Sequence, residues 1–146
     1  MDSASTIIRC PACGKANRVR PVPSGVPRCA ACHASLPWIV DASASSFGAE
    51  TDASVPVLLD FWAPWCGPCR AVSPLLERVA RSRAGHLKLV KINTDEEPAL
   101  AQRFGVQGIP LMVLLRDGTE IDRRVGALPE RALEQWLEPH IAAGAH

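Results

Sequence analysis

Three pairs of cysteines, each with two intervening residues, are the most chemically distinctive feature of this sequence. Two thiols at that spacing either close into a small disulfide ring or supply two of the four ligands of a tetrahedral metal site. Because thiols stay reduced in the cytosol, such cysteines favour metal ligation or redox catalysis over structural bridging in a cytoplasmic protein. The six cysteines of the chain form the pairs Cys10/Cys13, Cys29/Cys32 and Cys66/Cys69.

The pair Cys66/Cys69 differs from the other two in its predicted setting. Residues 55–62 form an apolar run typical of a buried central strand, and apolar residues recur at helical spacing from about Cys66 onward. At a helix start, Cys66 would lie over unpaired backbone N–H groups at the positive end of the helix dipole. This predicts a pKa below the usual value of about 8.5 for its thiol. Pro68, in the first turn, would stiffen the ring without removing an internal hydrogen bond.

This setting predicts different roles for the two thiols. Cys66 would attack a substrate disulfide and form a mixed disulfide. Cys69, which lies one turn further in and is more shielded, would then attack Cys66 and release the reduced substrate. The alternatives are half of a structural zinc site, for which no second pair lies nearby in the sequence, or two buried core cysteines.

The elements that must position this pair are predicted from hydrophobic periodicity and turn signals. Asp117-Gly118 is a hairpin signal, so the last two strands should pair antiparallel. The alternation of strands and helices predicts an α/β fold with a central mixed sheet flanked by helices. After the strand at 55–62 and its following helix, we expect a strand at 87–93, a helix starting at 94–98 and ending near 104, strands at 111–115 and 120–125, and a helix from 129 to about 141.

Two charged residues stand out within the predicted strands. Asp60 lies in the otherwise apolar run before the cysteine pair, where burial of its carboxylate would raise its pKa. The alternative is a residue near the strand end that points to water. Lys91, in the next predicted strand, is on its own typical of a solvated charge.

The four N-terminal cysteines have the spacing of a tetrahedral zinc site. Fifteen residues separate the two pairs, and four thiolates would leave no open position for water, so we expect one structural zinc ion. The segment around them is too poor in large apolar side chains to fold unaided, and the metal would stabilise it. Two disulfides, four independent redox thiols and a rubredoxin-like iron site are the alternatives, and His33 is expected to be a bystander. The predicted ligands are Cys10, Cys13, Cys29 and Cys32.

Composition and charge exclude several classes of function. The formal net charge is +1, but residues 1–40 hold five basic residues against one acidic residue, whereas the remainder has an acidic excess. This asymmetry predicts two structural units. The five basic residues lack interleaved aromatic residues, so we expect no nucleic-acid binding. The sequence has no signal-peptide core and no run of roughly 18 apolar residues, so we expect a cytoplasmic protein without membrane association.

The run from Asp60 to Arg70, DFWAPWCGPCR, closely resembles the active-site stretch of thioredoxins. FGVQGIP at 104–110 and VGA at 125–127 also match patterns of that family, in the same order. The resemblance implies a thioredoxin fold and protein-disulfide reductase activity. It also implies disulfide-containing client proteins and electron supply from NADPH through thioredoxin reductase. Pro64, Arg70 and Leu111 depart from the family pattern, in which an acid, a lysine and a threonine are common.

The resemblance also implies roles for individual residues. Asp60 would accept the proton of Cys69, and Lys91 would sit near Asp60. Ile109-Pro110 matches the cis-proline loop of the family, which lies against the active site and offers backbone groups to a bound peptide. Gly126 would either allow close approach of the substrate or simply end a strand. The residues expected to contact substrate are Trp65, Gly67, Pro68, Ile109, Pro110 and Gly126.

A four-cysteine module ahead of such a domain resembles the zinc-containing, thioredoxin-2-type bacterial thioredoxins. The predicted organisation is a zinc-binding module at 1–36, a linker and possible first strand at 37–46, and a thioredoxin domain at 47–146. We expect a monomer with one zinc ion, a redox-active Cys66–Cys69 disulfide and no organic cofactor. The alternatives are a zinc-ribbon module that binds a partner, and a disulfide isomerase or oxidase. The Gly-Pro between the cysteines and the expected cytoplasmic location favour a reductant.

Overall fold

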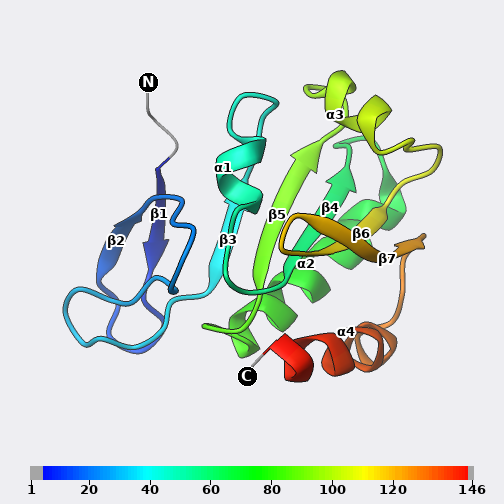
Figure 1. The fold of residues 1–146 in the computed structure, drawn as a ribbon. Coiled ribbons are helices and arrows are strands. Elements are labelled where there is room, and N and C mark those ends of the chain that lie inside the picture. The colour runs from blue at the N-terminus through cyan, green and yellow to red at the C-terminus, as the bar shows by residue number, and fades with distance from the viewer. Residues whose placement is uncertain (1–4, 145–146) are drawn as a thin grey trace.

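The computed structural model describes residues 5–144, so the outer ends of the two predicted units, residues 1–4 and 145–146, lie outside the described residues. Seven strands and four helices form in this range (Figure 1). The strands are β1 (Thr6–Arg9), β2 (Ala16–Val19), β3 (Trp38–Asp41), β4 (Val57–Trp62), β5 (Lys88–Asn93), β6 (Leu111–Arg116) and β7 (Thr119–Val125). The helices are α1 (Phe47–Thr51), α2 (Gly67–Ser82), α3 (Pro98–Arg103) and α4 (Glu130–Gly144).

A five-stranded mixed sheet in the order β3-β5-β4-β6-β7 forms the centre of the molecule. The strands β3, β5 and β4 run parallel, whereas β6 and β7 run antiparallel to their neighbours. The central strands β4 and β6 are buried along almost their whole length, as expected for strands covered on both faces. The predicted α/β class, mixed sheet and closing hairpin are therefore confirmed.

Two separate hydrophobic clusters cover the two faces of the sheet. On one face, Val72 and Leu76 of α2 and Leu137 of α4 pack with Leu58 and Met112. On the other face, α1 and α3 supply apolar side chains to a larger cluster that includes Phe47, Leu100 and Phe61. The five-residue helix α1 was not predicted, because it is too short to show a helical period.

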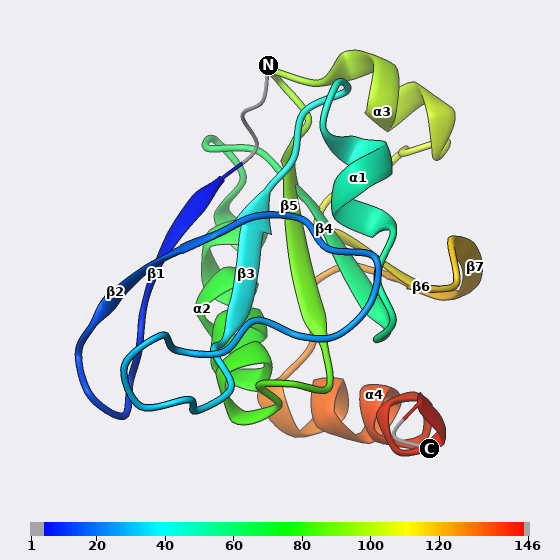
Figure 2. The ribbon, with the colours of Figure 1, turned by 60° about the vertical axis from the view of Figure 1, so that its left-hand side comes forward.

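The N-terminal residues share this second cluster with the sheet. Ile8 and Val19 of the β1–β2 hairpin are buried in it, and Val22 and Val26 of the following segment pack against it. Figure 2 shows that segment passing across β3 and β5, and the hydroxyl of Ser54 donates to the Gly25 carbonyl at 3.3 Å. The zinc-ribbon-like module is therefore packed onto the sheet rather than held at a distance from it, and the boundaries at 36 and 47 stay a prediction.

A buried ion pair joins three elements at the start of β5. The Lys88 ammonium donates to Glu50 of α1 at 2.8 Å, and the two side chains are 0% and 4% exposed. The same ammonium lies 4.2 Å from the centre of the Trp38 ring on β3. Burial lowers the pKa of Lys88, while the carboxylate of Glu50 opposes this effect. No local sequence pattern marks this pair, because Glu50 and Lys88 are far apart along the chain.

Within residues 5–144, no helix is both long enough and apolar enough to cross a membrane.

Candidate active site and metal centre

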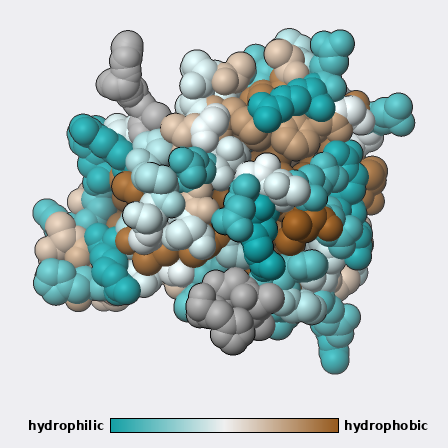
Figure 3. All heavy atoms as spheres, in the orientation of Figure 1, coloured by the Kyte–Doolittle hydropathy of each residue, from teal (hydrophilic) through white to brown (hydrophobic). Residues whose placement is uncertain are grey.

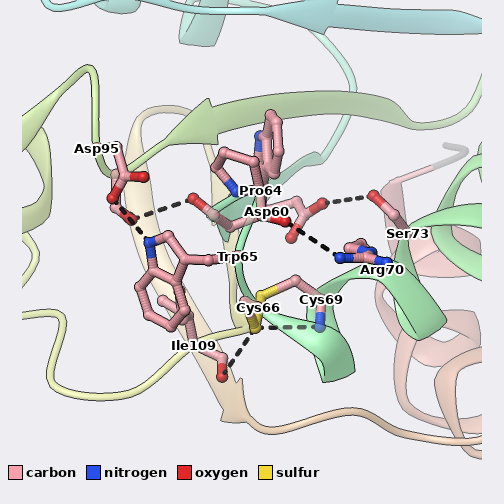
Figure 4. The surroundings of a disulfide bond; sticks show 11 residues. Asp60, Pro64, Trp65, Cys66, Cys69, Arg70, Ser73, Asp95 and Ile109 are labelled. Atoms are coloured by element: carbon pink, nitrogen blue, oxygen red, sulfur yellow. Dashed lines mark hydrogen bonds between the residues drawn. A yellow bond between two sulfur atoms is a disulfide. The ribbon is translucent and has the colours of Figure 1, made fainter.

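Cys66 and Cys69 form a disulfide at the N-terminus of α2 (Figure 4), with their Cα atoms 5.3 Å apart. Cys66 is the N-cap residue, and its Sγ accepts a hydrogen bond from the backbone N–H of Cys69 at 3.2 Å. Pro68 lies in the first turn, where its missing N–H removes no helical hydrogen bond. The sulfur of Cys66 therefore lies at the end of the helix where unpaired N–H groups and the helix dipole stabilise negative charge.

Only one of the two cysteines lines the adjacent groove. Cys66 is 4% exposed and Cys69 is 1% exposed, so both are largely enclosed in the disulfide form. A groove of about 500 Å³ borders Cys66 but not Cys69, which matches the predicted difference in shielding. Trp65, at the rim of this groove, is 68% exposed. The lining residues are Trp65, Cys66, Gly67, Pro68, Thr94, Ala101, Val106, Gln107, Gly108 and Ile109.

The loop before β6 lies against the disulfide. The Ile109–Pro110 peptide bond is cis, and the Ile109 carbonyl oxygen lies 3.8 Å from the Sγ of Cys66. The Pro110 carbonyl accepts the backbone N–H of Gly126 at 2.8 Å. Gly126 has a φ of +95°, and a Cβ there would meet no atom within 4 Å. The backbone conformation after β7, rather than a close contact within the chain, therefore favours glycine at this position.

Asp95 is a residue near the site that the sequence analysis did not identify. Its carboxylate accepts a hydrogen bond from the indole N–H of Trp65 at 3.1 Å (Figure 4). The run 94–98 was predicted to start a helix, and α3 begins at the last residue of this run, Pro98. Asp95 therefore lies in the loop beside the groove, where it holds the exposed indole of Trp65.

Asp60 lies on β4 and is completely buried, with 0% exposure and its carboxylate in contact with Ser73 of α2. Burial raises its pKa to about 6, and Glu77 also raises it, whereas Lys91 and the hydroxyl of Ser73 lower it. Ser73 donates to one carboxylate oxygen at 3.4 Å, and the other oxygen has no hydrogen-bond partner among the described residues. The predicted rise in the pKa of Asp60 is confirmed.

Lys91 lies beside Asp60 in the sheet but pairs with a different carboxylate. The two residues are cross-strand partners on the parallel strands β5 and β4. The Lys91 ammonium donates to Glu77 of α2 at 2.8 Å and lies 5.6 Å from the centre of the Trp62 ring. Glu77 was not identified from the sequence, because it appears there only as a polar position on the helix between apolar ones.

The four N-terminal cysteines converge on one point. Their sulfur atoms all lie within 4.8 Å of one another. Two sulfur–sulfur contacts join one pair to the other: Cys10 to Cys32 at 3.6 Å and Cys13 to Cys29 at 3.5 Å. Tetrahedral bonds of about 2.3 Å to a zinc ion place sulfur atoms roughly 4 Å apart. All four cysteines are free thiols in this structure, so the donor set and its spacing fit a four-thiolate metal ion.

Matching backbone turns build the two halves of this cluster. The backbone N–H of Gly14 donates to the Cys10 carbonyl at 2.8 Å, and that of His33 donates to the Cys29 carbonyl at 2.9 Å. Gly14 and His33 both have left-handed backbone, with φ of +84° and +67°. His33 therefore occupies the turn position that glycine fills in the other half, and it is not part of the four-residue cluster. Asn17 links the halves, because its side-chain oxygen accepts the backbone N–H of Ala30 at 2.9 Å.

The free thiols of this cluster do not all ionise equally. The backbone N–H of Cys32 is the largest influence on Cys29 and lowers its pKa to about 6. For Cys13, the backbone N–H of Lys15 lowers the pKa, but the Cys29 thiol, burial and the other two cysteines together raise it to about 11. A bound cation would favour the thiolate form of these ligands.

Comparisons with known proteins match these features. The family model for thioredoxin matches residues 27–139. Thioredoxin 1 of Nostoc sp. is 47% identical over 98 residues, which cover 66% of this chain and 92% of that protein. Thioredoxin of Bacillus subtilis is 44% identical over 103 residues, covering 70% of this chain and 98% of that protein. Among solved structures, a mutant thioredoxin from Halobacterium salinarum aligns with a TM-score of 0.67 at 33% identity, covering 74% of this chain and 95% of that chain. With the Cys66–Cys69 disulfide at the start of α2, these matches show that the chain belongs to the thioredoxin family of thiol–disulfide oxidoreductases.

Proposed function

We propose that this protein reduces disulfides in client proteins through Cys66 and Cys69. The observation that carries the proposal is the placement of the pair. The disulfide lies at the N-terminus of α2, and Cys66, but not Cys69, borders a groove. In the reduced protein, the backbone N–H groups of the first helical turn stabilise a thiolate at Cys66. Client segments enter the groove between the exposed Trp65 and the loop at Ile109.

The reaction proceeds in two exchange steps. The Cys66 thiolate attacks one sulfur of the client disulfide, so that the client S–S bond breaks, a mixed disulfide forms and one client thiolate leaves. The Cys69 thiolate then attacks the Cys66 sulfur, which breaks the mixed disulfide and releases the second client thiolate. Two electrons pass from the dithiol to the client, and the chain is left with the Cys66–Cys69 disulfide.

Asp60 supports the second step by accepting the proton of Cys69. Its pKa of about 6 allows the carboxylate to take up and release a proton near neutral pH. Lys91 and Glu77 act through Asp60, because they shift its pKa in opposite directions. The proposed substrate contacts are Trp65, Gly67, Pro68, Ile109, Pro110 and Gly126.

The family supports the proposed partners, and the cysteine cluster supports the proposed metal. Thioredoxins in general work with thioredoxin reductase and disulfide-containing clients, and we propose that an NADPH-dependent thioredoxin reductase regenerates this dithiol. Cys10, Cys13, Cys29 and Cys32 would hold one zinc ion, which would supply structural cross-linking and no open coordination position. Four clustered thiols are chemically suited to a reducing compartment, and this supports the cytoplasm as the location. The monomeric state stays a prediction.

An insulin-reduction assay with NADPH and a thioredoxin reductase tests the proposal. The wild-type chain should turn over, Cys66→Ser should be inactive, and Cys69→Ser should accumulate mixed disulfides with insulin. Reductase activity that survives Cys66→Ser would contradict the mechanism. Efficient oxidation of a reduced client, with little reduction of insulin, would instead support the oxidase or isomerase alternative.

A further inference from the structure

A second groove, of about 520 Å³, lies on the N-terminal module and shares no lining residue with the groove at Cys66. It is formed by β2, the segment that follows it and the turn of the second cysteine pair. Figure 3 shows hydrophilic residues over much of the outer side of this module. Four exposed cations line the groove: Lys15, Arg18, Arg20 and Arg28.

The positive charge of this groove is not neutralised by any acidic side chain of residues 5–40, which contain no Asp or Glu. Arg18 donates to the Ser5 hydroxyl at 3.3 Å and Arg28 to the His33 carbonyl at 3.4 Å, and both acceptors are uncharged. Four thiolates with one divalent cation would add two negative charges, fewer than the five positive charges of residues 5–40. The groove therefore presents a net positive field to the solvent.

The groove also offers apolar and backbone contacts. Val22 and Val26 are half-buried in its lining, and Val19 is 7% exposed. Within residues 5–144, β2 pairs only with β1, so its other edge has no strand partner there and could pair with an extended segment. Residues 5–37 contain no Phe, Tyr or Trp, so the groove has no aromatic ring on which a nucleic-acid base could stack.

We propose that this groove binds an extended acidic segment of a partner protein. Carboxylates of the segment would pair with the four cations, and its apolar side chains would contact Val22 and Val26. Electrostatic complementarity would speed the encounter and select acidic partners. This binding is separate from disulfide exchange, and it remains possible in a chain without the redox cysteines.

Fluorescence anisotropy with the zinc-loaded Cys66→Ser/Cys69→Ser chain tests the proposal, since this background cannot form mixed disulfides at the redox site. The probe is a labelled peptide of about 12 residues in which Glu alternates with Val. We expect saturable binding that weakens as salt is added. Arg18→Glu/Arg20→Glu should weaken binding by about tenfold. The matched control is Arg78→Glu/Arg131→Glu, which makes the same change in net charge on exposed positions of α2 and α4.

Each possible result bears on the proposal. Retained binding in the control, with loss in the groove variant and no binding of a Lys-Val peptide, would support it. Absence of binding at millimolar peptide, or equal loss in both charge-reversed chains, would overturn it. Tighter binding of a single-stranded oligonucleotide than of the acidic peptide would also overturn it. Zinc content and circular dichroism verify that each variant is folded, so that weaker binding is not caused by unfolding.

Discussion

Asp60 and Lys91 are neighbours on adjacent strands, yet the ammonium group of Lys91 forms its ion pair with Glu77 of α2, at 2.8 Å. Asp60 is left with one hydrogen bond from Ser73 and an oxygen without a partner among the described residues. Its pKa therefore reflects opposing influences: burial and Glu77 raise it, whereas Lys91 and Ser73 lower it. Lys91 on β5 and Glu77 on α2 thus influence the pKa of Asp60 on β4, the group that would exchange a proton with Cys69.

Replacing Asp60 with Asn should change how stability depends on pH. The folded-state pKa of Asp60 is raised from 3.8 to about 6, so its contribution to stability is fully present below pH ~4 and is lost as the pH rises through about 6. Ionised Asp60 then lowers the free energy of unfolding by roughly 3 kcal/mol. Asp60→Asn should therefore be the more stable chain at pH 8 and show no such advantage at pH 4. Urea unfolding across this range measures the difference, and a gap that does not vary with pH would contradict the prediction.

Glu77→Gln and Lys91→Met should move the pKa of Asp60 in opposite directions. Loss of the Glu77 charge removes an influence that raises the pKa of Asp60, so this pKa should fall. Loss of the Lys91 charge removes an influence that lowers the pKa of Asp60, so this pKa should rise. Carbon-13 NMR of the Asp60 carboxyl in the oxidised chain measures both shifts. Glu138→Gln, an exposed position on α4, is the control and should leave the titration unchanged; equal shifts in all three chains would refute the coupling.

Removal of the metal should destabilise the whole chain rather than the N-terminal module alone. Cys10 and Cys29 are buried in the same cluster as Phe61 and Ile92 of the sheet, so loss of the cross-link exposes part of that cluster. We expect a loss of several kcal/mol in the free energy of unfolding and one cooperative thermal transition. Circular dichroism before and after chelation measures both.

The metal content is checked by native mass spectrometry. One zinc ion per chain is expected, with loss on Cys10→Ala or Cys29→Ala and retention in the Cys66→Ser/Cys69→Ser control. A metal-free chain that carries two N-terminal disulfides would contradict the zinc site. A coloured, iron-loaded chain would identify the rubredoxin-like alternative.

The buried pair Lys88–Glu50 should behave as a unit. Lys88→Met leaves the Glu50 carboxylate buried without its partner and should lower stability by about 3–5 kcal/mol. Lys88→Met/Glu50→Leu removes both charges and should be less destabilised than Lys88→Met alone. A double-mutant cycle by urea unfolding measures this coupling, and strictly additive losses would show that the two side chains do not depend on each other.

Prediction from the sequence succeeded where a pattern is long or chemically specific. The apolar runs at 55–62, 87–93 and 111–115 predicted the strands β4, β5 and β6, and Asp117-Gly118 predicted the last hairpin. The hairpin strands β1 and β2 and the helix α1 were not expected, because elements of four or five residues are too short to show a period. Residues 37–46 were predicted as a linker and possible first strand, and residues 38–41 within them form β3 at the edge of the sheet.

The sequence by itself determined the chemistry available to the six cysteines, because the Cys-x-x-Cys spacing and the residues flanking each pair are local. Tertiary structure decided what surrounds them. It placed Ile109 against Cys66, Asp95 on Trp65 and Glu77 on Lys91, and it packed the four-cysteine module into the core of the redox domain. These contacts join segments far apart along the chain. Local spacing reflects backbone geometry within one turn, whereas the partner of a side chain depends on how the sheet and helices bring distant residues together.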